Sequence, residues 1–285
     1  MAAPIQIRSE QKCFGGVQGF YEHTSAACSG PMRFAVYLPP GAGDGNRIPA
    51  LYYLAGLTCT EETFVVKAGA QRLCADLGIA LVTCDTSPRA ARFAGDDERW
   101  DFGQGAGFYV DATEQPWSSA YRMHSYVVHE LRDIVETSFP IARDRRGIFG
   151  HSMGGHGALT IALTHPDLYA SCSAFAPICA PSQVPWGDLA FSRYLGSDKQ
   201  AWRSYDACAL IEEGKRFAGE ILVDQGLADK FLSRELRPDL LSAACEATGQ
   251  KLKLRRHDGY DHSYYFVQTF VASHLQHHAK QLHQA

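Results

Sequence analysis

Two kinds of segment are missing from this sequence. No apolar run approaches the roughly 20 residues that a transmembrane helix needs. Residues 1–8 lack the charged start and the long apolar core of a secretory signal peptide. We therefore expect neither a membrane anchor nor export.

An excess of charge of either sign is also missing. The formal net charge is −4 at pH 7, which offers no electrostatic footprint for nucleic acid or for an anionic membrane. The densest basic group, Arg143, Arg145 and Arg146, is interpreted as the solvated start of a strand. Neither nucleic acid nor a membrane is expected as a partner.

The cysteines lack the paired spacing of a disulfide framework or a metal site. There are nine of them, an odd number, spread along the chain. Cys84, Cys172 and Cys208 stand among apolar residues, which is typical of small core residues in a reducing compartment. We predict a cytoplasmic protein.

Ordinary globular features remain. Hydrophobic residues make up 46% and charged residues 20% of the 285 positions, enough to bury a sizeable core. Apolar strand-like runs alternate with helical patterns, without a linker or an internal repeat. This alternation predicts one α/β domain over residues 1–285, a three-layer sandwich around a mostly parallel sheet that opens with an antiparallel hairpin. The predicted strands are 14–21, 32–38, 49–55, 78–85, 147–149, 171–175, 220–224 and 251–255, and the longer predicted helices are 121–137, 231–248 and 264–282.

The chain is organised around a Gly150-His-Ser152-Met-Gly154 turn. A short apolar strand precedes it and a helical run follows it. This is the G-x-S-x-G nucleophile elbow in the strand–turn–helix context that gives the motif its meaning. The sharp turn exposes Ser152, and the glycines remove Cβ atoms that would collide. The alternative is a glycine-rich turn in which Ser152 only caps a helix.

Partners for Ser152 should follow later strands, because active sites of open α/β sheets form at the carboxyl ends of the strands. Asp229 lies beyond strand 220–224 and is favoured as the acid over Asp224, which still belongs to the strand end. His262 lies at the start of the last helix and is favoured as the base over His257.

The other histidines have no chemical constellation. His274, His277 and His278 have helix-face spacing, but no carboxylate or cysteine completes a metal site, and an exposed C-terminal helix explains them. Packing is the first interpretation for His151 and His156, which flank the elbow. No metal and no cofactor are expected.

Two backbone N–H groups are candidates for an oxyanion hole. One belongs to Met153, the residue after the nucleophile. The other belongs to Leu57, in a loop where Gly56 lets the backbone approach closely. With Ser152, Asp229 and His262, these groups predict acyl transfer to serine followed by hydrolysis.

Over nearly its whole length, the sequence resembles the S-formylglutathione hydrolase (esterase D) family. The matching runs, in the same order along the chain, include Leu54-Ala-Gly-Leu57-Thr58-Cys59-Thr60, Asp85-Thr-Ser-Pro-Arg89, Trp100-Asp-Phe-Gly, Gly105-Ala-Gly-Phe-Tyr-Val-Asp111, Gly150-His-Ser-Met-Gly-Gly-His-Gly157, Pro185-Trp186-Gly, Asp224-Gln-Gly and Gly259-Tyr-Asp-His-Ser-Tyr-Tyr-Phe266.

The resemblance implies an α/β-hydrolase fold and a cofactor-free serine thioesterase. Such an enzyme hydrolyses S-formylglutathione to glutathione and formate in formaldehyde detoxification, cleaves short-chain carboxylic esters as a side activity, and is often a homodimer. It also implies Ser152, Asp229 and His262 as the triad, and amide donors at Leu57 and Met153. Ala55 and the pair Leu227-Ala228 depart from the family pattern.

The substrate pocket is less defined. Cys59, His151 and Trp186 are candidates to line a small acyl pocket, although Trp186 could equally serve in packing. Lys67, Arg89 and Arg92 are plausible by position alone as holders of glutathione's carboxylates. A general short-chain carboxylesterase, a secreted acyltransferase and a catalytically inactive binding module are the alternative functions, and the retained triad residues and missing signal peptide argue against the last two.

Overall fold

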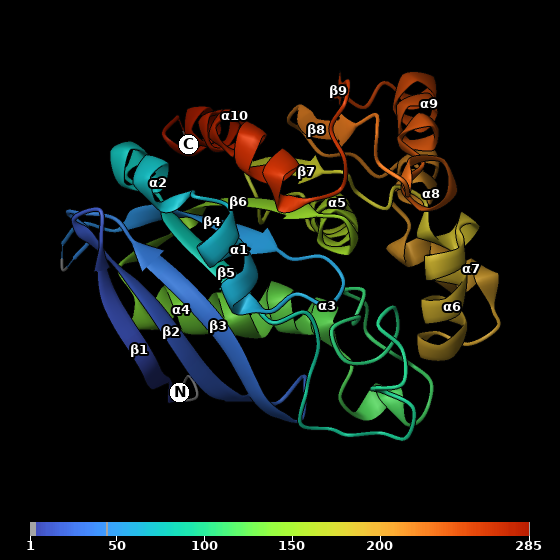
Figure 1. The fold of residues 1–285 in the computed structure, drawn as a ribbon, viewed down its shortest axis with the longest axis horizontal. Helices are drawn as coiled ribbons and strands as arrows, with labels where there is room; N and C mark the ends of the chain where they lie inside the picture. Colours follow the sequence, from blue (N-terminus) through green and yellow to red (C-terminus); the bar gives the residue numbers. More distant parts are fainter. Residues whose placement is uncertain (1–3, 44, 285) are drawn as a thin grey trace.

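A single sheet of nine strands runs through the molecule (Figure 1). The computed structural model describes residues 4–43 and 45–284. Residues 1–3, where the N-terminal segment considered as a leader begins, lie outside this description, as do residues 44 and 285. The strands are β1 (Gln6–Cys13), β2 (Gly16–Ser25), β3 (Gly30–Leu38), β4 (Ile48–Leu54), β5 (Ala80–Cys84), β6 (Ile141–His151), β7 (Ser171–Phe175), β8 (Ile221–Gly226) and β9 (Leu252–His257).

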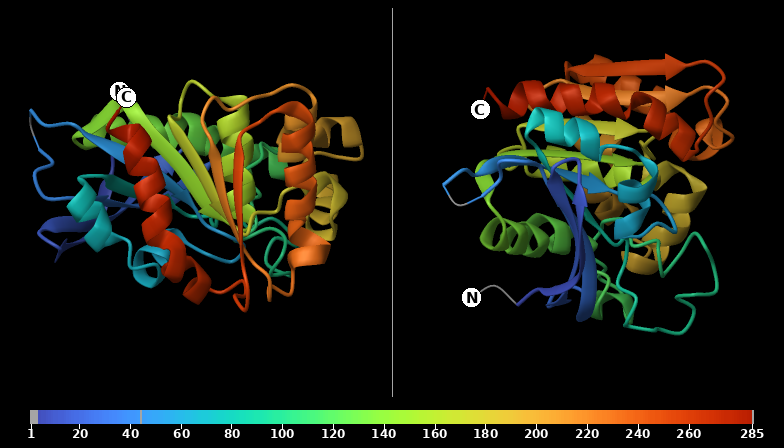
Figure 2. Two further views of the ribbon diagram at one scale, coloured as in Figure 1. Left: turned by 90° about the horizontal axis from the view of Figure 1, so that it is seen from above. Right: turned by 60° about the vertical axis from the view of Figure 1, so that its left-hand side comes forward.

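The sheet is parallel in its centre and antiparallel at one side. Its spatial order is β1-β2-β3-β5-β4-β6-β7-β8-β9. The pairs from β5 to β9 are all parallel, and those from β1 to β5 are antiparallel. The predicted mostly parallel sheet with an antiparallel N-terminal hairpin is therefore confirmed. In Figure 2, β1–β3 run at a steep angle to β8 and β9, which shows the twist of the sheet.

Helices cover both faces and complete the three layers. On one face α10 (Tyr264–Leu282) packs on β6 and β7, next to α1 (Glu61–Lys67) and α2 (Gln71–Leu77) over β5 (Figure 1). On the other face lie α5 (Met153–Thr164) and the helix formed by α3 (Met123–Ser125), the π-helical η2 (Tyr126–Leu131) and α4 (Arg132–Ser138). The remaining helical elements are η1 (Trp117–Ser119), η3 (Pro181–Gln183), α6 (Pro185–Tyr194), α7 (Lys199–Trp202), η4 (Arg203–Tyr205), α8 (Ala207–Glu212), the π-helical η5 (Leu232–Leu236) and α9 (Pro238–Thr248). No helix within residues 4–43 and 45–284 is both long and apolar enough to cross a membrane.

The structure differs from the prediction at β1 and within the predicted helix 231–248. β1 was missed because it is a polar edge strand, exposed along most of its length, so it has no buried face to produce an apolar alternation. The predicted helix 231–248 is interrupted, because Arg237 has φ +50° and Pro238 then starts a new helix at its first position. α1 begins with a capping box between Thr60 and Thr63.

The expectation of exposed histidines on the C-terminal helix was also wrong. His274 and His278 are fully buried against β7. The Oγ of Ser173 lies 2.8 Å from His274 Nδ1 and 2.8 Å from His278 Nε2. Ser171 Oγ lies 2.6 Å from the other nitrogen of His278. The helical spacing of the histidines therefore marks the buried face of α10, where polar partners on the sheet satisfy the rings.

Asp224, which lies in β8, anchors the same region. Its carboxylate is buried and receives the Arg255 guanidinium through two 2.5 Å hydrogen bonds. His274 Nε2 and His257 Nε2 each lie 3.2 Å from it. Burial opposes the charge, but the hydrogen bonds from His274, Arg255 and His257 hold the pKa of Asp224 below its ordinary value. Burial lowers the pKa of His274 to about 4, although Asp224 acts in the opposite direction.

We expect the fold to lose stability on acidification between pH 6.5 and about pH 4. In this range His274 becomes protonated in the unfolded chain but stays neutral in the folded chain. The unfolded state therefore binds more protons, and the free energy of unfolding decreases as the pH is lowered. Urea unfolding from pH 7 to pH 4.5 measures the slope, which should be shallower in His274→Gln. The matched control, His283→Gln at the exposed end of the chain, should keep the parent slope. Equal slopes for the parent and His274→Gln would contradict this assignment.

Candidate active site

Ser152 lies on a strained turn between β6 and α5. Its backbone has φ +58° and ψ −120°, a combination that residues other than glycine rarely adopt. The turn requires close packing on both sides of the serine. A Cβ atom on Gly154 would lie 1.9 Å from Leu54 O, and one on Gly150 would lie 2.2 Å from Gly154 O. The two motif glycines are therefore necessary for the geometry of Ser152.

The structure brings three residues from distant parts of the chain together. His262 Nε2 lies 2.9 Å from Ser152 Oγ, and His262 Nδ1 lies 2.5 Å from Asp229 Oδ2. Asp229 is buried in the loop after β8, and its other oxygen accepts a hydrogen bond from the Phe231 N–H at 2.9 Å. The imidazole can take the serine proton while Asp229 fixes its tautomer and orientation.

The two rival candidates lie elsewhere. β8 continues to Gly226, so Asp224 remains inside the sheet and binds Arg255. His257 ends β9 and lies beside Asp224 and the Phe270 ring. Neither His257 nor Asp224 lines the cavity at Ser152.

The proposed oxyanion donors flank this serine. Met153 is the first residue of α5, and Leu57 lies in the loop after β4 that lines the same cavity as Ser152. Neither N–H donates to a backbone acceptor within the described ranges. A Cβ atom on Gly56 would lie 3.1 Å from Ser152 Cβ, so the loop passes very close to the nucleophile. Two unpaired N–H groups are thus available beside Ser152 for a negatively charged oxygen.

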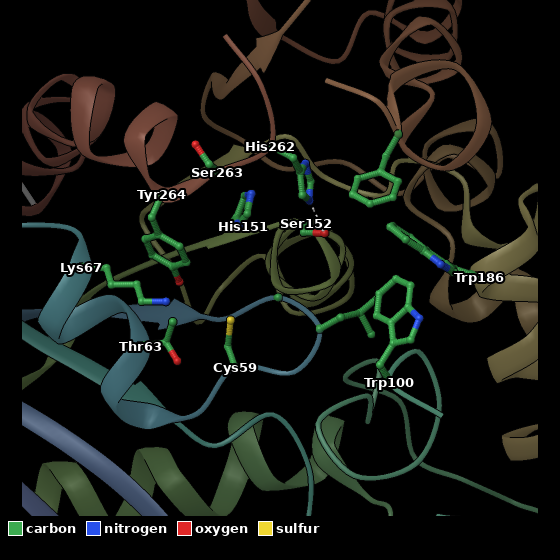
Figure 3. A pocket seen from close by; sticks show the side chains of 13 residues that line it. Cys59, Thr63, Lys67, Trp100, His151, Ser152, Trp186, His262, Ser263 and Tyr264 are labelled. Carbon is green, nitrogen blue, oxygen red and sulfur yellow. Dashed lines mark hydrogen bonds between the residues drawn. The ribbon is translucent and has the colours of Figure 1, made fainter. Parts of the chain in front are cut away.

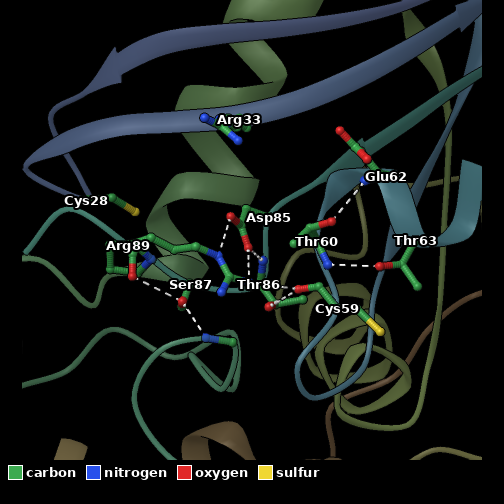
Figure 4. A network of polar contacts seen from close by, with 12 residues as sticks. Cys28, Arg33, Cys59, Thr60, Glu62, Thr63, Asp85, Thr86, Ser87 and Arg89 are labelled. Carbon is green, nitrogen blue, oxygen red and sulfur yellow. Dashed lines mark hydrogen bonds and ion pairs between the residues drawn. The ribbon is translucent and has the colours of Figure 1, made fainter. Parts of the chain in front are cut away.

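A polar network holds the loop that carries Leu57 (Figure 4). The Cys59 carbonyl accepts hydrogen bonds from Thr86 Oγ1 at 2.6 Å and from Arg89 Nη2 at 3.1 Å. The Arg89 guanidinium is fixed in turn by two hydrogen bonds, of 2.7 and 2.9 Å, to Asp85. Next to Leu57, the Thr58 N–H donates to Gly105 O at 2.8 Å. Arg89, a positional candidate for binding glutathione's carboxylates, is therefore engaged in bracing this loop.

A cavity of about 230 Å³ opens over Ser152 (Figure 3). The three pocket candidates, Cys59, His151 and Trp186, all line it, but Figure 3 shows Trp186 across Ser152 from Cys59 and His151. Lys67, which the sequence suggested by position alone, also lines the cavity. Five further lining side chains were not predicted from the sequence: Thr63, Trp100, Phe231, Ser263 and Tyr264.

Burial keeps two cavity side chains near the proposed triad, His151 and Cys59, in their neutral forms. Burial, followed by the charge of His262, lowers the pKa of His151, whose ring centroid lies 4.5 Å from that of His262. Burial raises the pKa of the Cys59 thiol, so it stays protonated and is a poor alternative nucleophile. Within the described ranges, no group of three or more His, Cys, Asp or Glu side chains is arranged to hold a metal ion.

A mostly parallel sheet, a serine on a strained strand–helix turn and an adjoining His–Asp pair define a serine hydrolase of the α/β-hydrolase fold. A family model described as "Putative esterase" matches residues 25–277. S-formylglutathione hydrolase of Paracoccus denitrificans is 53% identical over 282 residues, covering 99% of this chain and 100% of the relative. The mouse S-formylglutathione hydrolase is 51% identical over 275 residues, covering 96% and 97%.

Solved structures agree. A structure of the S-formylglutathione hydrolase from Agrobacterium tumefaciens superimposes with a TM-score of 0.93 at 49% identity, covering 97% of this chain and 99% of that one. The chain therefore belongs to the S-formylglutathione hydrolase family of esterases.

We expect Arg89→Met to lower kcat for p-nitrophenyl acetate about tenfold to hundredfold, with little change in KM. The substitution removes one of the two side-chain hydrogen bonds to the Cys59 carbonyl and lets the Leu57 N–H move. An oxyanion donor acts mainly in the transition state. Arg89→Lys should recover part of the loss. Steady-state kinetics at matched thermal stability provides the measurement.

The control is Arg92→Met in the same segment, whose side chain is exposed. It should leave kcat unchanged. An Arg89→Met variant whose kcat stays at the parent value would contradict the bracing role.

Proposed function

We propose that this protein hydrolyses S-formylglutathione to glutathione and formate, with Ser152, Asp229 and His262 as the catalytic triad. Short-chain carboxylic esters are a side activity of the same site. One observation supports the proposal most directly. His262 lies 2.9 Å from Ser152 Oγ and 2.5 Å from Asp229 in a cavity-lining position, in a chain about half identical to S-formylglutathione hydrolases over nearly its full length.

The first half of the reaction forms a formyl ester on Ser152. Ser152 Oγ attacks the formyl carbon while His262 Nε2 takes its proton. The resulting oxyanion accepts hydrogen bonds from the Leu57 and Met153 N–H groups. The carbon–sulfur bond then breaks, and the imidazolium of His262, stabilised by Asp229, returns the proton to the departing sulfur.

The second half regenerates the serine. A water molecule gives its proton to His262 and attacks the formyl ester, so the same two N–H groups hold the second oxyanion. The bond from carbon to Ser152 Oγ breaks, His262 protonates the serine, and formic acid leaves and ionises to formate in water. The proton transfers at the serine, the sulfur and the attacking water all run through His262.

The site suits a thioester with a small acyl group. A thiolate is a better leaving group than an alkoxide, so bond cleavage needs less acid assistance. The cavity of about 230 Å³ is lined by large rings such as Trp100, Trp186 and Tyr264. A general short-chain carboxylesterase would use the same machinery, and comparing kcat/KM for S-formylglutathione and p-nitrophenyl acetate separates the two functions.

Three further properties belong to this proposal. We place the protein in the cytoplasm, which suits its nine free thiols, seven of them buried. We expect a single domain, since one sheet contains strands from residue 6 to residue 257. The homodimer implied by the family resemblance is also expected, and Ile7 and Phe14, 59% and 56% exposed at the edge of the sheet, offer apolar surface for it.

Ser152→Ala should reduce hydrolysis of S-formylglutathione by at least about 10⁴-fold, because no other group can carry the formyl ester. The melting temperature and circular dichroism should stay close to those of the parent. Ser192→Ala, on an exposed position of α6, is the matched control and should keep full activity. A folded Ser152→Ala protein with near-normal turnover would exclude this mechanism.

We expect kcat/KM for p-nitrophenyl esters to fall at least about tenfold from acetyl to butyryl, since overfilling a packed pocket forces neighbouring side chains to move. The variants Trp186→Leu and Cys59→Ala test which side of the cavity binds the acyl group. If the acyl group points toward Trp186, only the first variant should relax the preference for short chains. A flat chain-length profile in the parent would reject the small acyl pocket.

A further inference from the structure

The cavity over Ser152 has two sides of different chemistry. Figure 3 shows Trp186 and Trp100 on one side, and Cys59, Thr63, Tyr264 and Lys67 on the other. The first side is aromatic: Trp100 and Trp186 meet edge to face, and Trp186 contacts the Phe231 ring. The second side carries hydroxyl groups, a thiol and an ammonium group.

The polar side continues into a second cavity. This space of about 380 Å³ is lined by Lys67, Ser263, Tyr264, Tyr265 and Gln268. Three of these residues, Lys67, Ser263 and Tyr264, also line the catalytic cavity. The two spaces therefore adjoin between the end of α1 and the start of α10, and together they are called the groove below.

Lys67 is the only lysine or arginine among the residues that line the groove, and none of them is an aspartate or glutamate. Within the described ranges no carboxylate forms an ion pair with its ammonium. Lys67 Nζ lies 5.6 Å from the centroid of the Tyr264 ring, and Figure 3 shows it pointing into the cavity. Asp261, two residues before Ser263, accepts hydrogen bonds from the N–H and hydroxyl of Ser263.

The rim of the second cavity is exposed and partly apolar. Tyr265, which lines this cavity, is 82% exposed. An aromatic side chain left this open can cover the backbone and methylene groups of an extended ligand. The groove thus combines one cation with an exposed aromatic ring and several polar side chains.

The leaving group must begin next to His262, because this residue protonates the departing sulfur. Ser263 and Tyr264 follow His262 directly and form the wall shared by the two cavities. A peptide attached to that sulfur can therefore extend along the groove toward Lys67. Glutathione carries two carboxylates, and its glycyl carboxylate is one residue from the cysteine that holds the sulfur.

We propose that Lys67 binds a carboxylate of the peptide thiol leaving group, with the groove along α1 and α10 as the binding site for that peptide. This inference rests on the proposed function, since it assigns one part of the S-formylglutathione substrate to one side of the cavity. The acyl group then points toward the aromatic side. Lys67 is a specificity-determining residue that discriminates anionic peptide thioesters from neutral esters.

The test compares two substrates in purified, full-length variants. Lys67→Ala should lower kcat/KM for S-formylglutathione about tenfold, mainly through KM, and Lys67→Glu should lower it further. Lys67→Arg should retain most of the parent value. For the neutral substrate p-nitrophenyl acetate, all three variants should stay within about twofold of the parent. Added salt should raise the KM for S-formylglutathione in the parent and have less effect in Lys67→Ala.

Two matched lysines serve as controls. Lys280→Ala changes an exposed lysine on α10 away from the groove and should leave both substrates unaffected. Lys230 lies on the aromatic side, 4.9 Å from the centroid of Phe231. A loss of S-formylglutathione activity in Lys230→Ala but not in Lys67→Ala would overturn the inference and place the peptide on the aromatic side.

The other outcomes separate this inference from the proposed function. If the parent hydrolyses S-formylglutathione and Lys67→Ala keeps its KM, the Lys67 assignment fails and the function stands. If both substrates lose activity equally in Lys67→Ala, the residue has a general structural role and the assignment also fails. A parent that cleaves p-nitrophenyl acetate but not S-formylglutathione would contradict the function itself.

Discussion

The strained backbone at Ser152 is the constraint on which the rest of the site depends. A φ of +58° in a non-glycine residue persists only when surrounding structure holds it. Here β4 and β6 provide that support, because the backbone of Leu54 lies against Gly154 with no room for a Cβ atom. The same close packing brings Gly56 and Leu57 beside the serine. One packing contact therefore sets both the nucleophile and one predicted oxyanion donor.

Two aspartates that are five residues apart show how the sheet assigns separate tasks. Asp224 belongs to β8 and remains in the sheet, where Arg255, His257 and His274 surround its buried carboxylate. Asp229 comes after the strand has ended and reaches His262. The contacts of Asp224 hold α10 and β9 to β8. His262 lies in the short segment between the end of β9 and the start of α10. The buried network thus supports the position of the proposed base without touching the cavity.

The sequence was sufficient to predict strands β2 to β9, the elbow, and the two residues, Asp229 and His262, that come together with Ser152, because strand ends of a parallel sheet converge on one edge. Spacing favoured Asp229 over Asp224 as the acid, and the end of β8 at Gly226 shows why Asp224 stays in the sheet. Other features carried no local signal. β1 is exposed along most of its length, and the buried histidines of α10 are satisfied by Ser171 and Ser173, whose proximity depends on the fold. The groove at Lys67 likewise arises from packing between α1 and α10, which lie far apart in the sequence.

The proposed base, His262, lies beside a second imidazole, that of His151. The two ring centroids are 4.5 Å apart, so a proton on His151 would disfavour a proton on His262. Burial prevents this competition: His151 is 5% exposed, and its Nε2 has no hydrogen-bond partner among the described residues. Protonation of His151 would require a buried, unpaired charge, whereas His262 has Asp229 beside it. The proton from Ser152 therefore has one favourable acceptor, and the neutral His151 can serve as a wall of the cavity.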